Sequence, residues 1–472
     1  MNIAQEYKQF KFLYGIILKK NGGNIFMEKI NISENRCIPV TAVADVVICG
    51  AGPAGLGAAV FSARAGAKTV VIERYGVPGG MAAVGEVTPF MCSFHKEQEL
   101  DKPVFVEWKK RMEKYLPAEF SVRRSRDPYS CAARGINKES AALAAEDLLL
   151  ESGAEILYHH TLSGVVMEEQ KITAVRCITA GGEVAVRGKC FVDCTGDGEL
   201  AAFSGCRYTV GNERGECQPM TLCFKLSHVE TGWHKDSPDE KIFDLRRALN
   251  GSYAQAVADG KIRCPRENIL LFPFEMADDG VVHFNTTRVV NFDPVDGKSL
   301  SQAEIEGRRQ LRDIYFWLKN EIPAFRNARL MSMGVQIGVR ESRHIEGLFR
   351  LTEKDFKNCS RFEDGVARCA YSIDVHSPTG AGTRLEPITP GGFYEIPYRC
   401  LVAADCDNLL VGGRPISADA AIHSSFRIMP TAVSIGQAAG LAAARAALND
   451  VMPRQIDGRK LREELKEFGA YL

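Results

Sequence analysis

The apolar residues near the start of the chain fall into runs and faces that predict a strand, a helix and a second strand. Residues 46–48 form a short run of Val, Val and Ile, which is typical of a buried parallel strand. Apolar residues then recur at helical spacing over residues 56–63, and Gly66 is suited to end that helix. Residues 69–72 are apolar again. The pattern therefore predicts a β-α-β unit.

The middle of the chain predicts two helices and a group of short strands. Amphipathic spacing indicates helices at residues 104–116 and 138–152. Short β-like runs separated by turns then predict a small antiparallel meander, and an apolar strand follows them. The runs of the meander are residues 161–167, 172–179 and 183–189, and the strand is residues 190–194.

Beyond residue 217 the pattern of apolar and polar residues changes, and after residue 332 it returns to that of the first segment. Residues 218–332 contain alternating strand-like stretches followed by a helix, which predicts an inserted β-rich domain with a covering helix. The stretches lie near residues 221–227, 269–274 and 281–290, and the helix at about residues 302–321. The chain then returns to the first pattern, with an apolar strand at residues 407–413 and helices at residues 430–448 and 454–468.

Three glycines after the first strand have the spacing G-x-G-x-x-G. Gly50 permits a tight turn, Gly52 lets the backbone approach a pyrophosphate, and Gly55 lets helix and strand pack closely. Glu73 ends the second strand at about the 20-residue spacing of an acid that accepts hydrogen bonds from ribose hydroxyls. The alternative is that the glycines serve packing alone. Because strand, helix, strand and acid are in register, we predict one dinucleotide site; no second motif of this kind follows.

Composition and charge narrow the classes of function. The 472 residues have a formal net charge of zero, which argues against a nucleic-acid binder because such a protein needs a basic surface. The 15 cysteines are scattered and form no C-x-x-C, so we expect neither an iron-sulfur centre nor structural zinc. Buried free thiols favour a cytoplasmic protein. The apolar run at residues 10–18 is too short to span a bilayer, so no membrane partner is expected.

Motifs along most of the chain carry a family resemblance. GAGPAG (residues 50–55), with Glu73-Arg74 and Gly79-Gly80, resembles the FAD-binding start of the glutathione-reductase-like flavoproteins, and FVDCTGDGELAAFSG (residues 191–205) is similar to their second FAD-contacting motif. Other motifs resemble a narrower group, the FAD-dependent oxidoreductases related in sequence to the flavoprotein subunit of heterodisulfide reductase. They are residues 336–347, 373–376 and 412–444. The chain differs from that subunit because it lacks the clustered cysteines of its iron-sulfur centres.

The resemblance implies FAD as the cofactor and assigns residues to it. Glu73 would hold the adenosine ribose, Thr195 and Gly196 would lie beside the ADP part, and Met81 beside the isoalloxazine. Asp197 would either bind the ribityl hydroxyls or only cap the helix that follows. The cofactor-binding set is Gly50, Gly52, Pro53, Ala54, Gly55, Glu73, Arg74, Gly80, Met81, Thr195, Gly196, Asp197, Gly413, Arg414, Met429 and Thr431.

Met429, Pro430 and Thr431 begin the long helix near the end of the chain. A helix N-terminus presents free N–H groups and a partial positive charge. By resemblance, this end would face the N1–C2=O edge of the flavin and stabilise negative charge there. The alternative is an ordinary helix start that uses proline for its fixed φ.

The first catalytic candidates are His376 and its neighbour Asp374. The two residues lie two apart on a strand-like run, so their side chains share one face, opposite Ile373 and Val375. A carboxylate beside an imidazole can orient it as a general base. The alternative is that the two residues form a polar strand face that has no catalytic role.

Three further pairs of residues are candidates. His423 and Arg427 lie four apart before the flavin-facing helix, where they would move a proton and hold a carboxylate, or form only a structural pair. Arg340 and Arg343 lie three apart and would share a helical face that binds an anionic substrate, or would pair with nearby glutamates. Cys92 and His95 follow the flavin loop; a buried neutral thiol is the simpler interpretation of Cys92.

These observations predict an α/β protein with a doubly wound, Rossmann-like FAD-binding domain, built from discontinuous segments, and an inserted β-rich substrate domain. The predicted boundaries are an N-terminal extension at residues 1–40, FAD-binding segments at residues 41–217 and 333–472, and the insertion at residues 218–332. The predicted function is hydride transfer between a small, anionic substrate and flavin N5. The alternatives are an electron-transfer subunit that needs a protein partner, a flavin monooxygenase (TGDG resembles a motif of that class), or a flavin-binding enzyme without net redox change.

Overall fold

The computed structural model describes residues 37–88, 90–91, 94–95, 98–115, 137–230, 238–272, 280–389 and 391–472. The chain divides into two units, Met1–Ile38 and Pro39–Leu472, and all that follows concerns the second unit. The predictions for the start of the N-terminal extension and for Cys92 lie outside the described residues.

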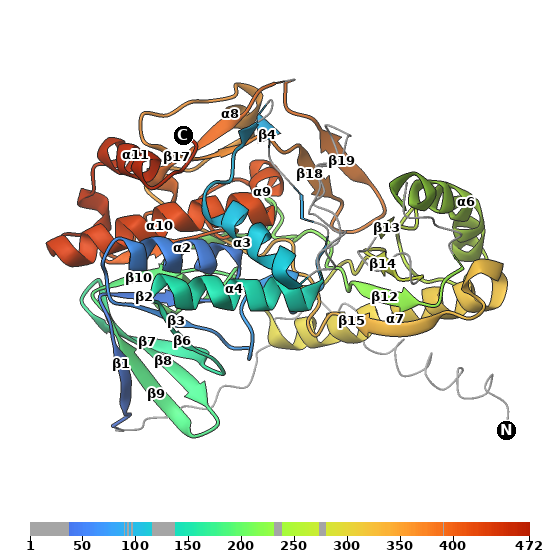
Figure 1. Ribbon diagram of the computed structural model, residues 1–472, viewed down its shortest axis with the longest axis horizontal. Helices are drawn as coiled ribbons and strands as arrows, with labels where there is room; N and C mark the ends of the chain where they lie inside the picture. Colours follow the sequence, from blue (N-terminus) through green and yellow to red (C-terminus); the bar gives the residue numbers. More distant parts are fainter. Residues whose placement is uncertain are drawn as a thin grey trace. The chain divides into compact units, whose positions relative to one another are not determined.

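A five-stranded sheet forms the centre of the second unit (Figure 1). All its neighbouring strands pair in parallel, and Asp193 at the end of the second strand in spatial order lies opposite both Cys49 and Val411. The carboxyl ends of three strands therefore meet at one edge, which is where open α/β sheets bind ligands. The strands, in spatial order, are β21 (Leu409–Val411), β10 (Cys190–Asp193), β2 (Val46–Cys49), β3 (Thr69–Ile72) and β6 (Glu155–Leu157).

Helices cover one face of this sheet, with α2 and α10 packed along each other (Figure 1). The two helices approach so closely that a Cβ on Gly57 would lie 2.2 Å from the carbonyl oxygen of Val433, and one on Gly436 would lie 2.0 Å from that of Ala54. Glycine is therefore required at both crossings. The helices of this layer are α2 (Pro53–Arg64), α3 (Val104–Met112), α4 (Lys138–Ser152) and α10 (Met429–Asn449).

A small four-stranded sheet lies on the side of the parallel sheet opposite these helices (Figure 1). Its buried residues, among them Ile172, Val175 and Val186, belong to the same hydrophobic core as the parallel sheet. The predicted meander is confirmed, and one more strand pairs in parallel with its edge. The strands are β1 (Val40–Val43), β9 (Gly182–Arg187), β8 (Lys171–Thr179) and β7 (Thr161–Glu168).

A second hydrophobic core is built from residues between Met220 and Val339. An antiparallel sheet and two long helices enclose it: β13 (Leu271–Phe272), β14 (Val282–Phe284), β12 (Phe224–Ser227), β15 (Arg329–Met333), α6 (Pro238–Ala258) and α7 (Gly297–Glu321). The sequence did not predict α6, because Asn250-Gly251 is typical of a turn and yet lies inside the helix. The domain boundaries themselves stay a prediction.

The remaining segments form two-stranded ribbons and short helices. The helical face predicted for Arg340 and Arg343 is wrong: Arg343 begins strand β16 (Arg343–Ile345), which pairs with β11 (Tyr208–Val210), and Arg340 lies in irregular structure before it. The other elements are β4 (Phe94–His95), β5 (Gln98–Glu99), β17 (Gly365–Cys369), β18 (Ile373–His376), β19 (Thr383–Glu386), β20 (Tyr394–Pro397), α5 (Glu199–Phe203), α8 (Glu353–Lys357), α9 (Ala420–Phe426) and α11 (Gly458–Glu467). Across the described ranges, no helix has the length and apolar character needed to cross a membrane.

Candidate active site

A cavity of about 610 Å³ lies at the carboxyl ends of the parallel strands. The segments that follow β2, β10 and β21 all line it, and so do residues from the second core and from the start of α10. We call its two parts the nucleotide half, lined by Gly50, Gly52, Glu73, Arg74, Thr195, Asp197, Glu199 and Arg414, and the arginine half, lined by Arg246, Arg266, Arg340, Tyr371, Asp374, His376 and Arg427.

The nucleotide half begins at the glycine turn between β2 and α2. Gly50 has φ +99°, and a Cβ there would lie 2.4 Å from the carbonyl oxygen of Cys194, so the turn requires glycine. Gly52 precedes α2 as its N-cap, and the first turn of α2 contains no acidic residue. The positive end of this helix therefore faces the cavity, where it can bind a pyrophosphate.

Glu73 closes the nucleotide half on the side of β3. Its carboxylate accepts hydrogen bonds from the backbone N–H of Ala51 (2.8 Å) and of Tyr75 (2.9 Å), which fix the side chain beside the glycine turn. Burial raises the pKa of Glu73, although the two N–H groups oppose the shift. The position matches that of an acid that binds ribose hydroxyls.

The turn after β10 is held by a buried carboxylate. Asp193 accepts hydrogen bonds from the N–H of Thr195 (3.0 Å), the hydroxyl of Thr195 (2.7 Å) and the N–H of Ala201 (2.9 Å). Asp197, two residues after Thr195, accepts from the hydroxyl of Ser342 (2.8 Å) and the guanidinium of Arg414 (2.9 Å). Since α5 is capped by Gly198 without a side-chain hydrogen bond, Asp197 does not cap that helix.

Most residues predicted to bind the cofactor line this one cavity. They are Gly50, Gly52, Pro53, Ala54, Glu73, Arg74, Gly80, Met81, Thr195, Gly196, Asp197, Gly413, Arg414 and Met429. Gly55 and Thr431 lie behind the lining: a Cβ on Gly55 would lie 1.8 Å from the carbonyl oxygen of Gly50, and Thr431 is fully buried in α10. The glycine turns, the helix end and Glu73 fit the ADP part of an FAD, so the residues present suit the cofactor that the resemblance implies.

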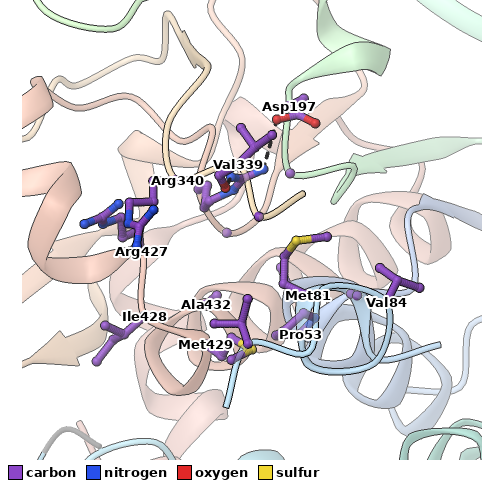
Figure 2. A pocket seen from close by; sticks show the side chains of 18 of the residues that line it. Pro53, Met81, Val84, Asp197, Val339, Arg340, Arg427, Ile428, Met429 and Ala432 are labelled. Atoms are coloured by element: carbon purple, nitrogen blue, oxygen red, sulfur yellow. Dashed lines mark hydrogen bonds and ion pairs between the residues drawn. The ribbon is translucent and has the colours of Figure 1, made fainter. Parts of the chain in front are cut away.

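The start of α10 borders the cavity at the junction of its two halves. Ile428 is the N-cap, and Met429 and Ala432 line the wall opposite Arg340 (Figure 2). No side chain caps this helix and its first turn contains no acidic residue, so its uncapped N–H groups carry the partial positive charge of a helix N-terminus. This arrangement agrees with the role predicted for Met429, which stays a prediction.

His376 and Asp374 form a pair on β18 that faces the cavity. The imidazole Nε2 lies 3.4 Å from a carboxylate oxygen of Asp374, and Nδ1 lies 3.0 Å from the hydroxyl of Thr383. Burial, together with the charges of Arg340 and Arg427, lowers the pKa of His376 to about 4, although Asp374 opposes the shift. Burial alone would raise the pKa of Asp374, but His376 and the two arginines lower it to about 2. The pair is therefore a neutral imidazole beside a carboxylate at neutral pH.

Arg340 and Arg427 lie next to each other on the same side of the cavity (Figure 2). Arg340 donates to the carbonyl oxygen of Pro219 (2.7 Å) and the hydroxyl of Thr221 (2.6 Å). Arg427 donates to the carbonyl oxygen of Asp374 (2.9 Å), and its Nη1 is buried without a hydrogen-bond partner among the described residues. Burial and then the charge of Arg427 lower the pKa of Arg340. The predicted anion-binding arginines are thus brought together, from a loop and from the end of α9.

Two further arginines of this half were not predicted. Arg246 lies on α6 and Arg266 in the segment between α6 and β13, and both line the cavity. Burial lowers the pKa of each, and the charge of Arg266 lowers that of Arg246 further. No sequence motif marks them, because their role depends on how the second core packs against the segments around Arg340 and Asp374.

His423 does not line the cavity. It lies on α9 with its side chain buried, 3.9 Å from Glu341, and its ring meets that of His344 edge-on at 4.6 Å. Burial, with the charges of His344 and Arg427, lowers the pKa of His423 well below its ordinary value. The potential metal-binding atoms of Glu341, His344 and His423 lie within 4.8 Å of one another. Hydrogen bonds from His344 (3.1 Å) and from the N–H of Gln218 (3.0 Å) already occupy both oxygens of Glu341.

Several known proteins are similar to this chain. A family model described as FAD dependent oxidoreductase matches residues 45–465. Thiamine thiazole synthase of Aeropyrum pernix is 30% identical over 166 residues, 32% of this chain and 54% of that protein. Thiamine thiazole synthase of Metallosphaera sedula is 31% identical over 177 residues, 34% of this chain and 58% of that protein. The chain spans little more than half the length of these relatives.

The solved structures that are similar include one described as geranylgeranyl bacteriochlorophyll reductase-like, from Thermoplasma acidophilum. It superposes with a TM-score of 0.48 at 14% sequence identity, over 91% of this chain and 84% of that one. A short match to thioredoxin reductase of Bacillus subtilis, 59% identical over 39 residues, covers 8% of this chain and 12% of that protein.

Proposed function

Because the chain belongs to the FAD-dependent oxidoreductase family, we propose that it transfers a hydride between a small, anionic substrate and N5 of a flavin held in the cavity. The observation that supports this proposal is the set of residues that line one cavity. The glycine turn of Gly50 and Gly52 lines it, and so do His376 and Arg340. A cofactor seated at the turn therefore has a proton-transfer pair and cations within the same enclosed space.

Bound FAD supplies the two-electron chemistry at its flavin ring. His376 would accept or return the substrate proton at Nε2 or Nδ1, since the imidazole is neutral at neutral pH and Asp374 lies 3.4 Å from Nε2. Asp374 would hold the ring in place and stabilise the protonated form. The charge of Arg427, which lowers the pKa of His376, favours return of the proton once the transfer is complete.

Arg340 and Arg427 would position the anionic group of the substrate. Hydrogen bonds to Pro219 and Thr221 fix the guanidinium of Arg340, so little entropy is lost when an anion binds. The free Nη1 of Arg427 provides a donor for the same anion. The start of α10 would stabilise negative charge on the opposite wall.

The test is flavin reduction. FAD-loaded protein is mixed anaerobically with a panel of small carboxylates, alcohols and amines, and the flavin absorbance is followed. The proposal expects a carboxylate-bearing compound to bleach the flavin at a rate that saturates with concentration. Reduction only by a protein partner would identify an electron-transfer subunit. Rapid reaction of the reduced protein with oxygen, with hydroxylated product, would identify a monooxygenase.

The narrower resemblance to the flavoprotein subunit of heterodisulfide reductase stays a prediction. It rests on residues 336–347, 373–376 and 412–444, which in the structure supply Arg340, His376, Arg414 and Arg427 to the cavity. A substrate taken from that group is not proposed, because the cysteine clusters that accompany its chemistry are missing from the sequence.

A further inference from the structure

The arginine half of the cavity contains more positive charge than one carboxylate needs. Among the residues that the structure describes, four guanidinium groups line it, from Arg246, Arg266, Arg340 and Arg427, against the single carboxylate of Asp374. The nucleotide half differs, because Glu73, Asp197 and Glu199 there accompany Arg74 and Arg414. The excess is therefore local to the half in which the substrate would bind.

The four arginines are poorly compensated. Asp374 lies 3.9 Å from Arg427, and within the described residues neither the side chain of Arg246 nor that of Arg266 has an ion pair or a hydrogen bond. The positive charge of Arg266 repels those of Arg246 and Arg340, and it therefore lowers the pKa of both side chains. Buried charges of one sign are costly unless an opposite charge neutralises them. A ligand with negative charge would supply that compensation.

The arginines form two pairs by the segments that supply them: Arg246 and Arg266 come from α6 and the segment after it, and Arg340 and Arg427 come from the loop before β16 and the end of α9. Arg340 and Arg427 lie side by side (Figure 2), and the charges of both act on His376. The charge of Arg266 acts on Arg246. Apolar side chains line the cavity as well, among them Leu270, Phe272 and Leu385. An arginine pair suits a carboxylate or a phosphate because its planar groups donate two parallel hydrogen bonds.

We propose that the substrate carries two anionic groups, in the manner of a dicarboxylate. Arg340 and Arg427 hold the group nearer to His376, and Arg246 and Arg266 hold the group at the other end. This inference rests on the proposed function, since it names the substrate class of the same site. It makes Arg246 and Arg266 binding residues that determine the preference for dianions over monoanions.

The experiment titrates FAD-loaded protein with simple probes and follows the flavin spectrum and the heat of binding. The probes are succinate, glutarate and adipate, the monocarboxylates acetate and butyrate, the neutral succinamide, and inorganic phosphate. One dicarboxylate length should bind at least roughly 10-fold more tightly than the monocarboxylates, because a second charge-assisted contact is gained. Succinamide should not bind. Tighter binding of phosphate than of every dicarboxylate would assign the site to phosphate and overturn the dicarboxylate proposal.

Substitutions of individual arginines test the contribution of each pair separately. Arg266→Gln and Arg246→Gln should each weaken dicarboxylate binding by roughly 10-fold more than monocarboxylate binding, and Arg340→Gln should weaken both by roughly 10-fold. Arg247→Gln is the matched control: Arg247 neighbours Arg246 on α6, but its side chain is 76% exposed and pairs with Asp244. It should bind every probe as the parent protein does.

The outcomes separate this inference from the proposed function. If mono- and dicarboxylates bind equally and Arg266→Gln changes neither, the dianion proposal is wrong, whereas the oxidoreductase function stands on flavin reduction by another compound. FAD content measured in each variant shows that the fold is intact. A variant that loses FAD is replaced by the lysine substitution at the same position, which keeps the charge and should restore the preference in part.

Discussion

The nucleotide half of the cavity is shaped by backbone, whereas the arginine half is shaped by side chains that converge from distant segments. The first depends on two turns after neighbouring strands, at Gly50 and Thr195, which parallel pairing brings to one edge. The second depends on Arg246, Arg340 and Arg427, which belong to a helix, a loop and a helix end. Both meet at the start of α10.

This difference indicates which substitutions each half of the cavity tolerates. A turn that requires glycine tolerates few substitutions, because an added Cβ meets backbone atoms. In the arginine half, charged side chains can be substituted without moving the strands that form the nucleotide half. Under the proposed function, the cofactor would be bound by the part of the fold that is least free to change, and the substrate by the part that is most free to change.

The largest effect should come from a side chain placed where the backbone approaches the cofactor. Gly52 has φ −72° and ψ −173°, which valine also adopts, and a Cβ there would meet only Cα of Gly80, at 3.7 Å. Gly52→Val should therefore fold, yet lose FAD at least roughly 10-fold, because its side chain fills the approach to the pyrophosphate. FAD released on denaturation measures this.

The control for that variant is Gly251→Ala. Gly251 lies in α6, and nothing lies within 4 Å of a Cβ built on it. The alanine should leave FAD content unchanged and stabilise the helix by about 0.5–1 kcal/mol. If Gly52→Val retains FAD at the parent level, the nucleotide half is not where the pyrophosphate binds.

The next largest effect should come from His376 in the arginine half. His376→Ala should keep FAD bound and slow flavin reduction by the substrate by about 10²–10⁴-fold, which is the usual contribution of a positioned acid or base. His423→Ala is the comparison, because His423 is buried beside Glu341 and does not line the cavity. Stopped-flow reduction compares the two variants; equal rates in His376→Ala and the parent would exclude His376 as the proton carrier.

A smaller effect should appear in the pH dependence of flavin reduction. His376 acts as a base only when it is neutral, and its pKa is about 4 in the folded protein. The rate should therefore be constant from about pH 5 to pH 8 and fall as the pH drops through 4, whereas an unperturbed histidine would lose activity below about pH 6.5. Arg427→Gln removes a charge that lowers this pKa, so its acid limb should shift to higher pH.

The smallest expected effect concerns metals. The side chains of Glu341, His344 and His423 lie close enough together to bind a cation. However, the positive charges of Arg414 and Arg427 act on His423, and hydrogen bonds occupy both carboxylate oxygens of Glu341. The prediction from the cysteine pattern, that the protein has no iron-sulfur centre or structural zinc, therefore extends to these residues. Elemental analysis should find no stoichiometric metal, and chelators should change neither FAD content nor rate; zinc or iron that His423→Ala removes would contradict this.

The sequence predicted the segments that form the nucleotide half and four residues of the arginine half, but it missed Arg246 and Arg266, for a physical reason. The turn at Gly50, the helix after it and Glu73 are neighbours in the chain, so local spacing defines the β-α-β unit that the structure contains. The pairing of Asp374 with His376 was predictable too, since both lie on one face of β18.

Convergence of distant segments was not predictable. Arg246 and Arg266 line the cavity because α6 and the segment after it pack beside β13, and no local pattern encodes that contact. The same limit explains His423: four-residue spacing from Arg427 placed both near the flavin, but on α9 the imidazole is buried against His344 while the guanidinium faces the cavity. The helix predicted for Arg340 and Arg343 failed because β11 pairs with Arg343 from more than a hundred residues away.

The central claim is that one cavity holds the cofactor in one half and the substrate in the other, and a crystal structure of the FAD-loaded protein tests it most directly. The account predicts that the pyrophosphate lies at Gly52 and the start of α2, that Glu73 contacts the adenosine ribose, and that the flavin ring lies beside Met429 with one face open to His376 and Arg340. An FAD whose ring lies outside the arginine half, or whose adenosine lies away from Glu73, would contradict it.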